Sequence, residues 1–278
     1  MVADVDLIRP PRPFALGRRW LADRRRSTFA WALSLLGIIA VQLSVYPAVK
    51  SQPGITEMWD ELPQAMKAMF GVTGGLDFTS GPGYLRGEIF GFTLPLLFLV
   101  FGIGAGANAI AGDEEKGTLG LVLAQPVRRV RVVVERFAAV VGDATALALA
   151  VLVSIVVIGP MVGLHVGMAA LVGAVLATML LSCLFGSVAL AVGAATGHRG
   201  AALGASAGLA VAGYLLDSLA NITKVLKPLQ PASPFHWAPP GDLVTGGSAI
   251  GLVWFAVATV AFVVVSAWSF DHRDISRS

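Results

Sequence analysis

The sequence has little charge, and this scarcity excludes a water-soluble protein. Asp, Glu, Lys and Arg together make up 13% of the 278 residues, which is about half of their share in soluble domains. Hydrophobic residues account for 56%. The mean hydropathy of +0.77 leaves too little polar material to cover a surface in contact with water. We therefore expect an integral membrane protein.

Cysteine is almost absent as well. The single Cys183 excludes an internal disulfide framework and a metal cluster held by thiolates. The phosphate-binding pattern G-x-x-x-x-G-K-[ST] is also missing, because no glycine is followed by lysine anywhere in the chain. We expect this chain to bind no cofactor, to hold no ATP site and not to be an enzyme.

Long uncharged runs predict six membrane-spanning helices, because about 20 apolar helical residues cross the roughly 30 Å of hydrocarbon. The runs do not alternate between apolar and polar residues, which excludes a closed β-barrel. The longest run breaks at Gly159-Pro160-Met161-Val162-Gly163. We expect an all-α protein with an N-terminal segment (1–26), a six-helix domain (27–270), a tail (271–278), and spans at about 27–48, 89–112, 136–159, 166–196, 200–220 and 247–270.

The basic residues predict the orientation in the membrane. An even number of spans places both termini on one side, and that side carries fifteen Lys and Arg residues against five on the other. Basic residues gather on the cytoplasmic side of membrane proteins. We expect cytoplasmic termini in the plasma (inner) membrane. The same bias explains the pI near 9.3, so no nucleic-acid partner is needed.

The segment before the first span has an amphipathic pattern. Residues 14–26 contain apolar Phe14, Leu16, Trp20 and Leu21 beside five arginines. This composition is typical of a helix that lies in the inner headgroup layer, with its arginines on anionic lipids. An ordinary positively charged anchor for span one is the alternative.

A short cytoplasmic segment between spans two and three is the most informative part of the chain. An acidic cluster follows span two, Gly117 allows a sharp turn and Thr118 can cap a short helix. Pro126 ends that helix before the arginines that lead into span three. An apolar helix exposed to the cytosol needs a covering surface. A partner protein or the chain's own N-terminal helix would provide it.

These residues resemble the signature of ABC-2 type transporter permeases. The resemblance is carried by the runs Glu114-Glu115-Lys116-Gly117-Thr118-Leu119 and Leu123-Ala124-Gln125-Pro126-Val127-Arg128-Arg129, by Ser233-Pro234-Phe235, and by the ending Phe270-Asp271-His272-Arg273-Asp274-Ile275. It covers essentially the whole chain. Gly120 departs from the pattern, since the short helix usually carries a better helix former there.

The resemblance implies a half-transporter. Two six-span subunits, identical or related, would pair around a central path, and two copies of a cytoplasmic ATPase would bind ATP and Mg. The short helix would be the coupling helix, seated in a cleft of the ATPase. The residues implied in coupling are Glu114, Glu115, Gly117, Thr118, Leu119, Leu121, Val122, Leu123, Pro126 and Arg128.

Small and charged residues inside the spans suggest further roles. Gly200, Gly204 and Gly208 form a ridge on span five that allows close helix packing, either within the subunit or at the dimer seam. Asp143 and Asp217 are costly within a membrane but lie near span ends. We expect Asp143 to pair with Arg136 or Arg199.

Two other functions compete with this interpretation. An ion-coupled secondary transporter or channel would need deep ionisable residues or broken helices, and only Pro95 and the two aspartates qualify. An intramembrane hydrolase would use the G-x-S-x-G match at 204–208, but this match lies in an apolar helix and lacks a strand–turn–helix context. We expect an exporter of an amphipathic compound (a drug, an antibiotic or a lipid-like molecule), with the direction of transport implied by the resemblance.

Overall fold

The computed structural model describes residues 14–52, 77–124 and 127–273, together with positions 54, 57, 58, 61–63 and 66. The described residues form helices, turns and loops and contain no strand. Six helical segments are long and apolar enough to cross a membrane, which confirms the expected all-α class with six spans. The chain is therefore a multi-pass membrane protein.

The described residues form six spans, and short helices follow the second and the fifth of them. The spans are α1 (Ala15–Lys50), a segment made of α4 (Gly81–Tyr84), η1 (Leu85–Thr93) and α5 (Leu94–Ala109), then α8 (Arg129–Met161), α9 (Met168–Thr196), α10 (Arg199–Ala220), and η3 (Ala249–Gly251) continued by α13 (Leu252–His272). The short helices are α6 (Ala111–Glu115), α7 (Leu119–Leu123), η2 (Lys227–Ala232), α11 (Pro234–Trp237) and α12 (Pro240–Val244).

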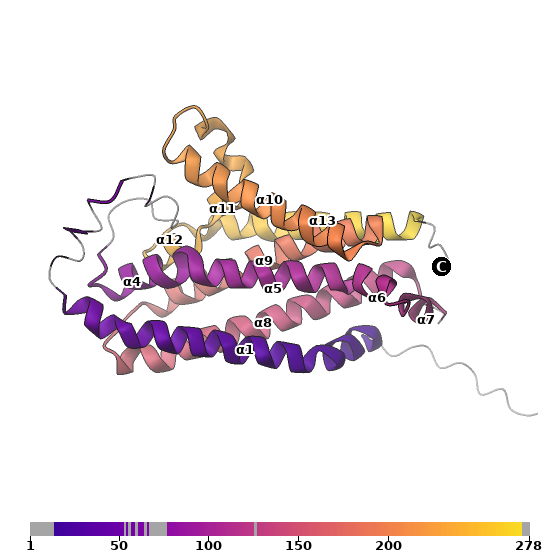
Figure 1. The fold of residues 1–278 in the computed structure, drawn as a ribbon, viewed down its shortest axis with the longest axis horizontal. Helices are drawn as coiled ribbons and strands as arrows, with labels where there is room; N and C mark the ends of the chain where they lie inside the picture. The colour runs from indigo at the N-terminus through magenta and orange to yellow at the C-terminus, as the bar shows by residue number, and fades with distance from the viewer. Residues whose placement is uncertain are drawn as a thin grey trace, which may run out of the picture.

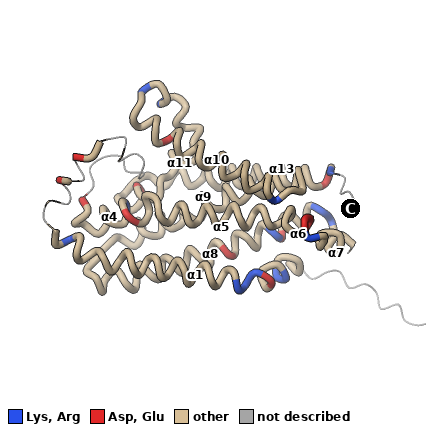
Figure 2. Tube along the Cα trace, in the orientation of Figure 1, with Lys and Arg blue, Asp and Glu red and all other residues tan. Residues whose placement is uncertain are grey.

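The long helices run side by side, and α9 lies at the centre of the bundle (Figure 1). It packs against α5, α8, α10, α12 and α13. The start of α1, the helices α6 and α7 and the end of α13 lie at one end of the bundle, while the end of α1, the start of α4 and the connection at residues 221–248 lie at the other. Basic residues gather at the end that carries α6 and α7 (Figure 2).

Glycines allow α5 and α9 to approach closely. A Cβ atom at Gly102 would overlap the Ser182 carbonyl oxygen, and one at Gly106 would overlap the Gly186 carbonyl oxygen. The Ser182 hydroxyl also donates to the Phe98 carbonyl oxygen over 2.5 Å. Small residues at such a crossing allow the two backbones to come into contact. The resulting van der Waals packing holds the helices together in lipid, where no hydrophobic driving force acts between them.

The N-terminal segment, where it is described, is part of the first long helix. It is helical from Ala15, but it runs into the first span without a break and packs along α8. Trp20 is buried, and the Glu135 carboxylate on α8 accepts the backbone N–H groups of Leu16 and Gly17 over 2.9 and 3.2 Å. These N–H groups have no partner within a helix, so Glu135 fixes the start of α1 against α8. The amphipathic pattern reflects this helix–helix contact.

Candidate coupling site

The segment between the second and third spans folds into two short helices joined by a tight turn. Gly117 lies in that turn with φ of 71°, a left-handed conformation that glycine adopts without steric cost. Thr118 precedes α7 but does not cap it as expected, because its side chain accepts no hydrogen bond from the helix. Its hydroxyl instead donates to the Asp113 carbonyl oxygen over 3.2 Å, which closes the turn back onto α6.

The apolar residues of α7 divide between the interior and the surface. Leu119 is 1% exposed, whereas Leu121 is 74% exposed. Val122 and Leu123 are half-buried. Leu119 therefore anchors α7 on the bundle, and Leu121 presents an apolar side chain outward. Arg128 is exposed immediately before α8, and Pro126 lies outside the described residues.

Three consecutive acidic residues attach this segment to other spans, and we call Asp113, Glu114 and Glu115 the acidic clasp. The Asp113 carboxylate pairs with the Arg136 guanidinium of α8 at 2.7 Å. Arg136 is 4% exposed and also donates to the Ala109 carbonyl oxygen at the end of α5. Asp113 thus fixes α6 to the start of the third span.

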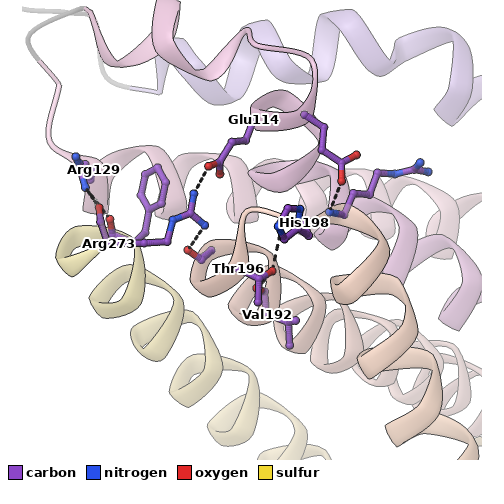
Figure 3. A network of polar contacts seen from close by, with 10 residues as sticks. Glu114, Arg129, Val192, Thr196, His198 and Arg273 are labelled. Atoms are coloured by element: carbon purple, nitrogen blue, oxygen red, sulfur yellow. Dashed lines mark hydrogen bonds and ion pairs between the residues drawn. The ribbon is translucent and has the colours of Figure 1, made fainter. Parts of the chain in front are cut away.

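Glu114 attaches the segment to the end of the last span (Figure 3). Its carboxylate pairs with the guanidinium of Arg273, which also donates to the Ala194 carbonyl oxygen of α9 over 3.0 Å. Arg129 donates to the Phe270 and Arg273 carbonyl oxygens over 3.1 and 2.7 Å. The end of α13 is therefore held between the acidic clasp and the start of α8.

Glu115 attaches the segment to α10. Its Oε1 accepts the backbone N–H of Arg199, the first residue of that helix, over 2.8 Å. A carboxylate stabilises a helix N-terminus by binding a free N–H group and by opposing the helix dipole. The clasp as a whole joins α6 to α8, α10 and α13.

Gly197 makes room for the clasp. Its φ of 72° ends α9 in the left-handed region, and a Cβ atom there would lie 2.8 Å from a Glu114 carboxylate oxygen. The acidic residues of the clasp were predictable from the sequence, but the roles of Arg136, Gly197 and Arg273 were not. The resemblance places Glu114 and Glu115 near a partner protein, and in this chain their carboxylates also contact Arg273 and the start of α10.

The glycine ridge of α10 does not pack within the described part of the subunit. A Cβ atom at Gly200, Gly204 or Gly208 would meet no other atom within 4 Å. One of the two expectations was that these glycines pack inside the subunit, and among the described residues the structure contradicts it. The ridge forms an open face of small residues on α10.

The two aspartates within the spans both have partners. Asp143 pairs with Arg24 of α1 at 3.9 Å, so the expected pairing with Arg136 or Arg199 is wrong. Arg136 turns instead toward Asp113, while the contact of α1 with α8 brings Arg24 to Asp143. Asp217 accepts a hydrogen bond from the Gln230 amide over 3.0 Å and lies 3.5 Å from Nδ1 of His236.

The serine of the G-x-S-x-G match lacks the surroundings of a nucleophile. Ser206 is 0% exposed inside α10, and its hydroxyl has no hydrogen-bond partner among the described residues. A catalytic serine needs an adjacent base and access for its substrate. The geometry gives no support to an intramembrane hydrolase.

Comparison with known proteins identifies the family. No curated protein matches the chain. The family model described as "ABC-2 family transporter protein" matches residues 19–275, a range that includes the acidic clasp, α7 and nearly all of the six spans. The chain therefore belongs to the ABC-2 family of transporter proteins.

Proposed function

We propose that this chain is the membrane-spanning permease subunit of an ATP-binding cassette transporter that exports an amphipathic compound. A separate ATPase subunit binds ATP and Mg and hydrolyses the ATP, and the permease itself is not an enzyme. The observation that carries this proposal is the acidic clasp, which joins the exposed helix α7 to three spans at one end of the bundle.

The clasp gives α7 the connections that a coupling helix needs. A partner that pushes on α7 through the exposed Leu121 moves α6, because the turn between them is closed by Thr118 and Asp113. Movement of α6 then reaches α8 through Arg136, α13 through Arg273 and the start of α10 through Glu115. An interface that favours one of two bundle arrangements can drive transport in this way.

The proposed assembly contains two permeases and two ATPase subunits. The open glycine face of α10 suits a seam with a second permease, identical or related, because small residues allow close contact between helices in lipid. The end of the bundle that carries α7, the start of α1 and the end of α13 faces the cytoplasm, in agreement with its basic residues (Figure 2). The transporter lies in the plasma membrane.

The spans favour an amphipathic cargo over a small hydrophilic ion, because their surfaces are apolar and nearly uncharged. Export, as opposed to import, follows the resemblance to the family. The alternative of an ion-coupled transporter or channel has less support, since Asp143 is paired with Arg24 and Asp217 lies near the end of α10.

Purification of the tagged chain from its host in mild detergent tests the proposal. Mass spectrometry should find an ATPase subunit with a phosphate-binding loop, and the complex should hydrolyse ATP. Leu121→Asp should reduce recovery of the ATPase, because it places a charge in the apolar contact of α7. Val225→Asp is the matched control, since Val225 is 83% exposed and lies at the opposite end of the bundle. A permease that purifies alone and without ATPase activity contradicts the proposal.

A further inference from the structure

An apolar groove of about 520 Å³ lies between α5 and α10, beside the segment that contains α11 and α12. Its walls include Leu99 and Ile103 of α5 and Leu203 and Ala207 of α10. Leu96, Val100, Val211 and Leu215 also line it and are 43 to 58% exposed, so the groove opens at the side of the bundle. A volume of this size suits one small organic molecule.

Aromatic rings gather at the end of this groove nearest the connections of residues 221–248. The Tyr214 ring centroid lies 6.4 Å from that of Phe92 and 5.5 Å from that of Phe235, and all three residues line the groove. Aromatic faces carry negative charge density and attract cations, most strongly where water is scarce. This end of the groove therefore differs chemically from the aliphatic walls that Leu99, Ile103, Leu203 and Ala207 form between α5 and α10.

Asp217 is the one charged residue among the described residues that line the groove. Its side chain is 19% exposed, accepts a hydrogen bond from the Gln230 amide over 3.0 Å and lies 3.5 Å from the His236 imidazole. The nearby Arg86 is already paired with Asp242 at 2.7 Å. Asp217 thus retains an accessible carboxylate edge beside the three aromatic rings, with no arginine or lysine of the groove lining to neutralise it.

We propose that this groove binds lipophilic monovalent cations, with the apolar body between α5 and α10 and the positive charge beside Asp217 and the aromatic rings. The inference rests on the proposed export function and names the class of compound that the groove selects. Burial of the apolar body supplies affinity for any hydrophobic molecule. The carboxylate and the rings supply the preference for positive charge.

A pair of ions with the same shape and opposite charge separates these two contributions. Tetraphenylphosphonium and tetraphenylborate both carry four phenyl groups around one charged atom. Each is titrated against the full-length chain in nanodiscs of uncharged phosphatidylcholine, and binding to empty nanodiscs is subtracted. Saturable binding of the phosphonium, with binding of the borate weaker by about tenfold or more, is the expected result. Equal binding of the two ions overturns the proposal.

Variants locate the binding. Asp217→Asn keeps the size of the side chain and its capacity to accept a hydrogen bond from Gln230, and it should weaken phosphonium binding by about tenfold. Asp217→Glu should retain binding. Ala207→Trp should block the groove, whereas Val257→Trp, on an exposed face of α13, should not. Phosphonium binding that survives both Asp217→Asn and Ala207→Trp also overturns the proposal.

The readout distinguishes this inference from the proposed function. Ion binding is measured on the permease chain itself, whereas the proposed function is tested by recovery of the ATPase. A chain that recovers its ATPase but binds both ions equally leaves the export function in place and removes the charge preference. A chain that binds the phosphonium selectively but recovers no ATPase supports the groove and contradicts the ATP-driven transporter.

Discussion

Glu114 at the end of α6 and Arg273 just beyond α13 form an ion pair between residues 159 positions apart in the chain. The pair joins the segment after the second span to the end of the last span. Its two side chains are 23 and 18% exposed, so the contact is shielded from most of the solvent. Arg273 also binds the Ala194 carbonyl oxygen of α9, which places the central helix in the same network.

Reversal of the Glu114 charge should uncouple transport. Glu114→Lys places an ammonium group beside Arg273 and removes a charge-assisted hydrogen bond, a loss of about 1.5–3 kcal/mol. Stimulation of ATPase activity by substrate should fall by about tenfold or more, while the proposed contact of Leu121 with the ATPase should be retained. The measurement is substrate-stimulated ATP hydrolysis by the reconstituted complex.

The reciprocal exchange is the control for this prediction. Glu114→Lys combined with Arg273→Glu restores opposite charges at the same two positions and should recover part of the stimulation. Full stimulation in Glu114→Lys alone would contradict the coupling role. Loss of the ATPase from the Glu114→Lys complex would instead show that Glu114 contacts the partner.

The architecture was largely predictable from the sequence because it depends on local patterns. Runs of about 20 uncharged residues signal spans without knowledge of their neighbours, and Gly117 marks its turn by residue type alone. The class and the number of spans were therefore correct. The continuity of α1 through residues 14–26 was missed because an amphipathic stripe appears the same whether it faces lipid or another helix.

The pairing of charged side chains could not be predicted from the sequence. Arg24, Arg136 and Arg199 all lay on the expected cytoplasmic side, and the nearest in sequence to Asp143 is Arg136. The choice of Arg24 depends on the packing of α1 against α8, which is a property of the tertiary structure. The engagement of Glu115 with the start of α10 likewise required the positions of two distant helix ends.

Acid should loosen the turn before α4. The pKa of Asp77 lies below its ordinary value of 3.8, chiefly because the Thr79 hydroxyl donates to its carboxylate. Because the pKa is lowered, the ionised Asp77 carboxylate stabilises the folded turn at pH values above the ordinary pKa. This stabilisation is lost as the pH falls through the pKa of the folded state. The protection factors of residues 77–84 in hydrogen exchange, which are corrected for the intrinsic exchange rate at each pH, should therefore fall below about pH 4.

Asp77→Asn is the comparison for that experiment. The variant cannot ionise, so its protection factors in residues 77–84 should be lower than those of the wild type at neutral pH and should lack the further decrease in acid. An identical acid response in the variant would assign the effect to another group.

Gly106 and Gly104 on α5 should respond in opposite ways to the same substitution. A methyl group at Gly106 overlaps the Gly186 backbone of α9, whereas one at Gly104 meets no atom within 4 Å. Gly106→Ala should lower the unfolding free energy by about 2 kcal/mol. Gly104→Ala should leave it unchanged or raise it by up to about 1 kcal/mol, because alanine favours a helix over glycine. Thermal unfolding in detergent measures both, and equal losses would contradict the close crossing of α5 and α9.

Gly204 offers a test of the proposed seam between two permeases. Because a Cβ atom there meets nothing within 4 Å among the described residues outside its own helix, Gly204→Leu should leave the fold of the single chain intact. At a helix contact made through small residues, the larger side chain separates the backbones and removes the packing that holds them together. The association constant of permease pairs, measured by native mass spectrometry, should fall by about tenfold or more, a change of about 1.4 kcal/mol in association free energy. Gly142→Leu on α8 is the matched control, since Gly142 is equally open and lies on a different helix. Loss of pairing in both variants, or in neither, would place the seam away from the glycine ridge of α10.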